Sequence, residues 1–114
     1  MQSIGFIAPL KPGKTETDRS AMISCWRGER QADYERSRQR LGITREAVFY
    51  QSTPTGDVAV VYMEADDMDA ALKAMATSDD PFDRWFRDHV REAHGINLED
   101  GFPPPEQVMD FRAS

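Results

Sequence analysis

One helix holds both histidines of this chain, and His89 is the residue best suited to chemistry. His89 falls within the apolar stripe of the helix, which also comprises Phe82, Trp85, Phe86, Val90 and Ala93. A histidine facing a protein interior can act as a general base, or as a hydrogen-bond donor to a carbonyl or phenol. This chemistry suits enolisation, cyclisation or oxygenation of an activated aromatic molecule. We therefore predict His89 as a catalytic residue; the alternative is a core histidine held by one hydrogen bond.

Two tyrosines, Tyr50 and Tyr62, lie on neighbouring predicted strands that are joined by a short turn. A type I turn with a bulge at Gly56 would place both rings on one face of the sheet, whereas a two-residue turn would separate them. We predict that both tyrosines bind a small ligand beside His89, and that Trp85 contacts the same ligand. Ordinary packing in the sheet and core is the alternative for all three aromatic residues.

The spacing of possible metal ligands disfavours a metal site. His89 and Glu92 are three residues apart on the helix, but His94 lies five residues from His89 and diverges around the helix axis. We therefore predict no metal and no cofactor, haem included. The only cysteine, Cys25, is predicted to be a small buried hydrophobic residue.

The composition narrows the class of protein. The 114 residues contain 20 acidic and 14 basic side chains, for a formal net charge of −6. A negative surface repels phosphate backbones, so nucleic acid is not an expected partner. No stretch resembles a signal peptide or an apolar membrane helix of about 20 residues. We expect a single domain over residues 1–114, soluble and cytoplasmic, with no membrane partner.

Turn and cap signals divide the chain into elements. Asp80 and Pro81 begin a helix that Gly95 ends, and a second, long helix spans 16–41 with Gly28 as its point of bending. A third helix is expected over 66–76. The predicted strands are 3–10, 46–52, 57–64 and 107–112, the last one after an extended linker at 101–105. The order β-α-β-β-α-α-β predicts an α+β, ferredoxin-like fold with a four-stranded antiparallel sheet.

The strand over 57–64 is apolar on both of its faces. Its alternating sets are Val58, Val60 and Tyr62 on one face, and Ala59, Val61 and Met63 on the other. A sheet with one solvated face would alternate apolar with polar residues. One layer of helices covers only one face, so we predict that the other face packs against a second subunit in a homodimer.

A ferredoxin-like unit with this two-faced apolar sheet resembles the dimeric α/β-barrel superfamily, which includes antibiotic-biosynthesis-type monooxygenases, stress-responsive A/B-barrel proteins and EthD-like proteins. Residues 9–14 and 79–86 are also similar to those of a small bacterial family in that group. The resemblance implies a dimeric α/β barrel that binds a small apolar or aromatic molecule in a cleft between helices and sheet. The implied activities are cofactor-independent monooxygenation, cyclisation or isomerisation. A non-catalytic ligand-binding protein and a purely structural dimer are the alternatives.

Overall fold

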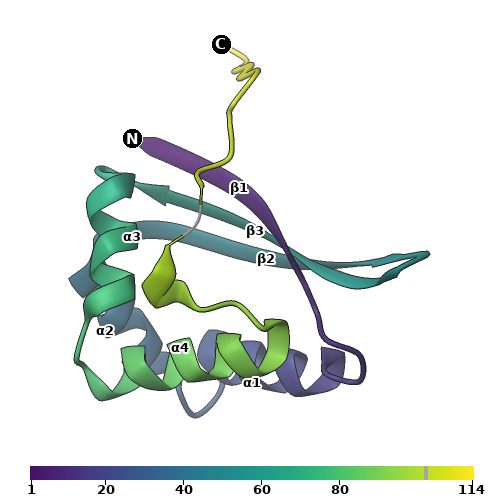
Figure 1. Cartoon of the computed structure of the whole chain (residues 1–114). Coiled ribbons are helices and arrows are strands. Elements are labelled where there is room, and N and C mark those ends of the chain that lie inside the picture. The colour runs from purple at the N-terminus through teal and green to yellow at the C-terminus, as the bar shows by residue number, and fades with distance from the viewer. Residues whose placement is uncertain (102) are drawn as a thin grey trace.

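The computed structural model describes residues 1–101 and 103–114, and these residues form an α+β fold (Figure 1). Its strands are β1 (Gln2–Pro9), β2 (Ile43–Thr53) and β3 (Gly56–Ala65). The helices are α1 (Thr15–Arg27), α2 (Gln31–Leu41), α3 (Met68–Thr77) and α4 (Pro81–His94), and a short 3-10 turn, η1, covers Leu98–Asp100.

Helix α4 begins and ends as its sequence predicts. The Asp80 carboxylate accepts a hydrogen bond from the backbone N–H of Phe82 at 2.9 Å, and Pro81 occupies the first turn. Gly95 adopts a left-handed conformation with φ 74°, and its N–H donates to the carbonyl of Arg91. These local interactions satisfy backbone groups that a helix end otherwise leaves unpaired.

The single long helix predicted over 16–41 is instead two helices. Helix α1 ends at Arg27, and Gly28 is extended, with φ −125° and ψ −152°. A side chain at Gly28 would place its Cβ 2.7 Å from the Cα of Ser24, so the backbone approach needs glycine here. The chain then turns, and α2 packs against both β2 and α4.

The sheet is antiparallel, with the strand order β1-β3-β2. Thr53 pairs with Gly56, so the hairpin between β2 and β3 has a two-residue turn. The helices cover one face of the sheet, called here the inner face (Figure 1). The outer face, which no helix covers, carries the side chains of Ile7, Phe49, Val58, Val60 and Tyr62. The prediction that β3 is apolar on both faces is therefore confirmed.

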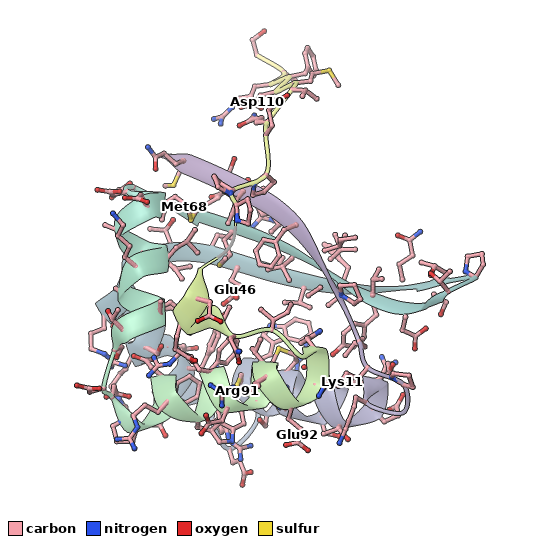
Figure 2. The ribbon with its side chains drawn as sticks, in the orientation of Figure 1. Lys11, Glu46, Met68, Arg91, Glu92 and Asp110 are labelled. Carbon is pink, nitrogen blue, oxygen red and sulfur yellow. The ribbon has the colours of Figure 1, made fainter. Side chains whose placement is uncertain are left out.

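The predicted fourth strand over 107–112 is not shown: residues 103–114 contain no strand, and the described sheet has three strands. A strand is held by a ladder of hydrogen bonds to a neighbour, and this segment is paired with neither edge strand of the sheet. It leaves the body past β1, as Asp110 shows in Figure 2. Val108, Met109 and Phe111 in it are each more than 80% exposed. Of the predicted linker at 101–105, Phe102 lies outside the described residues.

Two apolar clusters pack the helices, and only the larger one includes residues of the sheet. The larger one joins the end of the sheet to α2 and α3 through Leu41, Ile43, Met63, Ala65, Met68, Ala71 and Met75. The smaller one joins α1 to α4 through Cys25, Phe82 and Phe86. Cys25 is 3% exposed and burial raises the pKa of its thiol, as expected of a buried hydrophobic cysteine. Within the described residues, no helix has the length and hydropathy needed to cross a membrane.

Candidate functional site

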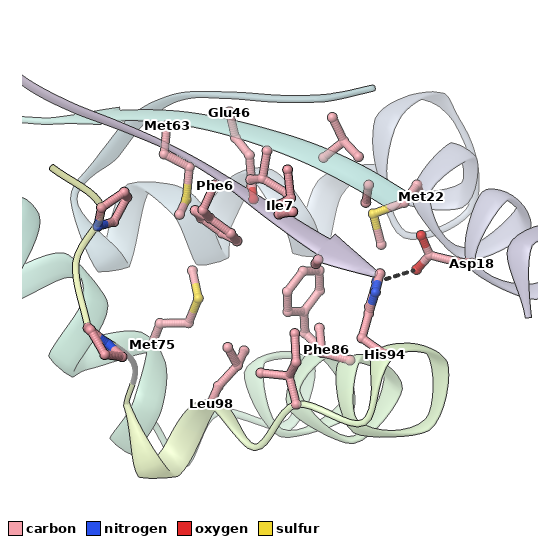
Figure 3. A pocket seen from close by; sticks show the side chains of 18 residues that line it. Phe6, Ile7, Asp18, Met22, Glu46, Met63, Met75, Phe86, His94 and Leu98 are labelled. Atoms are coloured by element: carbon pink, nitrogen blue, oxygen red, sulfur yellow. Dashed lines mark ion pairs between the residues drawn. The ribbon is translucent and has the colours of Figure 1, made fainter. Parts of the chain in front are cut away.

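A cavity of about 550 Å³ lies between the inner face of the sheet and α4 (Figure 3). Most of its wall is apolar and comes from the sheet, α1, α3, α4 and the chain after α4. The polar side chains on the wall are those of Asp18, Glu46 and His94. The other residues that line it are Phe6, Ala8, Met22, Val48, Ala59, Val61, Met63, Met75, Phe86, Val90, Ile96, Leu98, Pro103 and Pro105. Ile7 on the edge strand β1 also borders the cavity, although the strand register places it in the outer-face row with Val60.

Asp18 is the centre of a buried polar cluster at one end of this cavity. Asp18 is 2% exposed, and its carboxylate binds side chains from β2 and α4. Tyr50 donates its hydroxyl to Oδ2 at 2.5 Å, and His89 Nε2 lies 2.6 Å from Oδ1. His94 Nε2 is 3.7 Å from the same Oδ1. Three elements far apart in sequence therefore meet at one carboxylate.

The surroundings of Asp18 stabilise its charged form. Burial alone would raise the pKa of Asp18, but the hydrogen bonds with His89 and Tyr50 and the nearby His94 ring outweigh it, so the pKa lies well below the ordinary value of 3.8. Burial and the bond to this carboxylate raise the pKa of Tyr50, which keeps its hydroxyl protonated as a donor. Asp18 is therefore an ionised carboxylate at neutral pH.

His94 is the histidine on the cavity wall. Its side chain is 7% exposed, and Nδ1 lies 3.0 Å from the carbonyl oxygen of Pro9. Burial would lower the pKa of His94, but Asp18 and the Pro9 carbonyl raise it above the ordinary 6.5. With one ring nitrogen bound to the backbone, the other lies toward Asp18 (Figure 3). A histidine and a carboxylate in this arrangement form a pair suited to proton transfer.

His89, the predicted catalytic residue, lies beside this pair but is not among the residues that line the cavity. Its ring stacks on Trp85 with centroids 5.6 Å apart, and the guanidinium of Arg30 covers the Trp85 ring at 4.2 Å. Trp85 thus packs toward α1 and the turn before α2, and it is also absent from the cavity wall. His89 therefore binds the Asp18 carboxylate without lining the cavity, and this contact holds the carboxylate in place.

The hairpin register separates the two predicted ligand-binding tyrosines. Tyr50 pairs with Ala59, and Tyr62 pairs with Ala47, so their side chains lie on opposite faces. Tyr50 reaches the Asp18 cluster on the inner face. Tyr62 lies on the outer face and donates its hydroxyl to Glu64 at 2.6 Å. The two-residue turn therefore brings only Tyr50 to the candidate site.

Glu46 forms a second polar position on the wall (Figure 3). Its Oε1 accepts hydrogen bonds from Tyr34 Oη at 2.5 Å and from Arg38 Nε at 2.8 Å. The side chains of both Glu46 and Arg38 are less than 10% exposed. Glu46 and Arg38 therefore form a buried ion pair. Burial alone would lower the pKa of Arg38, but the pairing with Glu46 raises it.

Sequence reasoning missed Asp18, His94 and Glu46. One signal for Asp18 was present, since it shares a helical stripe with Met22 and Cys25 at spacings of four and seven. A carboxylate within an apolar stripe requires a buried partner. No comparable local signal marks His94, because its role depends on the carbonyl of Pro9.

Within residues 1–101 and 103–114, no group of three or more His, Cys, Asp or Glu side chains is arranged to hold a metal ion. No family model, no curated protein and no solved structure matches this chain.

Proposed function

We propose that this protein binds a small apolar or aromatic molecule in the cavity between the sheet and α4. The cavity itself is the observation that carries the proposal, because its volume of about 550 Å³ is in the range of small-molecule sites. An apolar wall with a few polar groups at defined positions is typical of such sites. Asp18 and His94 supply polar groups at one end, and Glu46 supplies another.

Filling the cavity should abolish binding of an apolar probe. We expect N-phenyl-1-naphthylamine to bind the wild-type protein saturably, with increased fluorescence. Val48 lines the cavity but is 38% exposed, so a larger side chain there does not require a closed core to expand. Val48→Trp should weaken binding by at least about tenfold, or about 1.4 kcal/mol.

Gln51→Trp is the matched control for this measurement. It lies on the same strand, is exposed, and faces away from the cavity. We expect it to bind the probe as the wild type does. Equal affinity of the Val48 variant and wild type would contradict the assignment of the cavity as the binding site.

The second part of the proposal is a homodimer packed through the outer face, as in the dimeric α/β-barrel superfamily that this sequence resembles. Ile7, Val60 and Phe49 form one row across the three strands of the described sheet. Ile7 is 63% exposed and Phe49 is 55% exposed. Face-to-face packing of two such sheets would bury on the order of 1,500–2,000 Å² in total, which is enough for a stable interface.

A charge within this row should disrupt the dimer. We expect wild-type protein at micromolar concentration to have the mass of a dimer by light scattering. Phe49→Asp should have the mass of a monomer, because it buries a carboxylate without a partner. Thr55→Asp, in the exposed hairpin turn, should remain dimeric. A monomeric wild type would refute the proposal.

Proton transfer to the bound molecule is a second function, favoured by the contact of His94 with Asp18 at the cavity wall. Of the three reaction classes that the resemblance implies, cyclisation and isomerisation use such a pair directly. His94→Phe should then retain probe binding and lose turnover of any substrate found by screening. Retained turnover would restrict the proposal to ligand binding.

A further inference from the structure

Three large apolar side chains near the C-terminus stay exposed in one protomer. Val108, Met109 and Phe111 are 84%, 81% and 84% exposed, more than any other large apolar side chain of the described residues. A single exposed apolar side chain is ordinary on a protein surface, but three within four residues indicate a contact surface. The function proposed above makes no use of them.

The segment that carries these side chains begins at the cavity and continues to the outer face. Pro103 and Pro105 line the cavity on the inner side of the sheet. Asp110 and Arg112 line a hollow together with Tyr62, whose side chain lies on the outer face. Figure 1 shows the segment continuing past β1 on the side of the sheet away from the helices. One segment therefore links the cavity wall to the outer face.

Residues 103–114 make their polar contacts among themselves. Within the described part of the chain, Gln107 donates to the carbonyl of Met109 at 3.4 Å, and Arg112 pairs with Asp110 at 3.3 Å. A segment that is fixed in one conformation loses conformational entropy, which its contacts must offset. The protomer provides such contacts where the segment lines the cavity, and it leaves the three apolar side chains in water.

A second copy of this chain is the body that these side chains can reach. The outer face is apolar, and the homodimer proposed above packs two such faces together. The segment emerges on that side of the sheet, so a second copy packed there would border the three exposed side chains (Figure 1). Their burial would favour association in proportion to the apolar area removed from water.

We propose that Val108, Met109 and Phe111 pack against the second copy in the homodimer, and that this contact holds Pro103 and Pro105 in the cavity wall. Dimer formation and ligand binding then strengthen each other. Such coupling is reciprocal, so the ligand favours the dimer to the extent that the dimer favours the ligand. The inference rests on the proposed function, because it requires both the cavity and the dimer.

The test removes the apolar contact from the segment in the full-length chain. Met109→Ser combined with Phe111→Ser should leave the circular dichroism spectrum unchanged, because both side chains are more than 80% exposed. Light scattering over a dilution series should show that the dissociation constant of the dimer rises at least about tenfold. The affinity for N-phenyl-1-naphthylamine should fall at least about fivefold, measured where the wild type is a dimer.

The matched control is Ile23→Ser combined with Trp26→Ser, which also removes two exposed apolar side chains. Ile23 and Trp26 are 48% and 67% exposed on α1, in the helical layer, and neither lines the cavity. This control should keep the dimer and the probe affinity of the wild type. Saturating probe should lower the dissociation constant of the wild-type dimer and of the control, but not that of the segment variant.

The outcomes separate this inference from the proposed function. A segment variant that dimerises as tightly as the wild type would overturn the inference and leave the proposed homodimer standing. A weakened dimer with wild-type probe affinity would overturn the coupling to the cavity. A wild type that is monomeric, or that binds no probe, would overturn the inference together with the corresponding part of the proposed function.

Discussion

Replacement of Asp18 by alanine should lower the free energy of unfolding by about 3–5 kcal/mol, the usual cost of breaking a buried ion pair by removing one partner. The carboxylate is 2% exposed and binds Tyr50 and His89. Without it, a hydroxyl and an imidazole would be buried with no acceptor between them. Urea unfolding, followed by circular dichroism, measures the difference.

The matched control for this result is Asp88→Ala on α4. Asp88 is exposed and forms an ion pair with Arg91 within the helix, at 3.0 Å. Exposed pairs of this kind contribute little, so the change should stay within about 0.5 kcal/mol. Equal losses for the two variants would mean that the Asp18 cluster does not hold α1 to α4.

The same cluster predicts how stability depends on pH. The pKa of Asp18 is lowered on folding, so its contribution is present above about pH 3.8 and is lost as the pH falls toward the folded value. The pKa of His94 is raised, so its contribution is complete below about pH 6.5 and is lost as the pH rises through the folded value. Together they favour stability between these limits.

Asp18→Asn should flatten this profile at both ends, because it removes the titrating carboxylate at the acid end and the charge that raises the pKa of His94 at the other. Asn retains the size of the side chain and an acceptor for Tyr50, so it serves if the alanine variant does not fold. An Asn variant with the wild-type dependence on pH would show that other groups set the profile.

Phe86→Ala should cost about 3–5 kcal/mol, the range for deletion of a large core aromatic side chain. Phe86 is 9% exposed and packs against Phe82 with ring centroids 6.3 Å apart. It also supports the guanidinium of Arg38. The substitution therefore removes apolar contacts between α4 and α1 together with a cation–π contact, and it opens additional empty volume beside the cavity.

Asp80→Ala is the comparison for this prediction, because it alters the same helix without touching its apolar face. It removes one cap, worth about 1 kcal/mol, and an ion pair with Arg40 in which both side chains are more than one-third exposed. Thermal melts should therefore rank Phe86→Ala as the more destabilising. The reverse order would mean that Phe86 does not pack in the core.

Local signals in the sequence determined much of the fold. The caps at Asp80 and Gly95 and the apolar stripe between them were sufficient to define α4, because helix ends depend on groups within a few residues. The alternation of β3 likewise predicted two apolar faces, because side chains alternate along any strand. The turn-forming residues 54–56 predicted the hairpin but not its register.

Only the tertiary structure decided the composition of the site. The two-residue turn places Tyr62 on the outer face and Tyr50 on the inner face, whereas a register shifted by one residue would place both on the same face. Asp18 gained its partners from β2 and α4, and His94 was held by the Pro9 carbonyl, contacts that span 32 to 85 residues. Residue type and spacing identify groups capable of chemistry. Which of them share a cavity depends on strand register and helix packing, and these are set by long-range contacts that no local stretch of sequence contains.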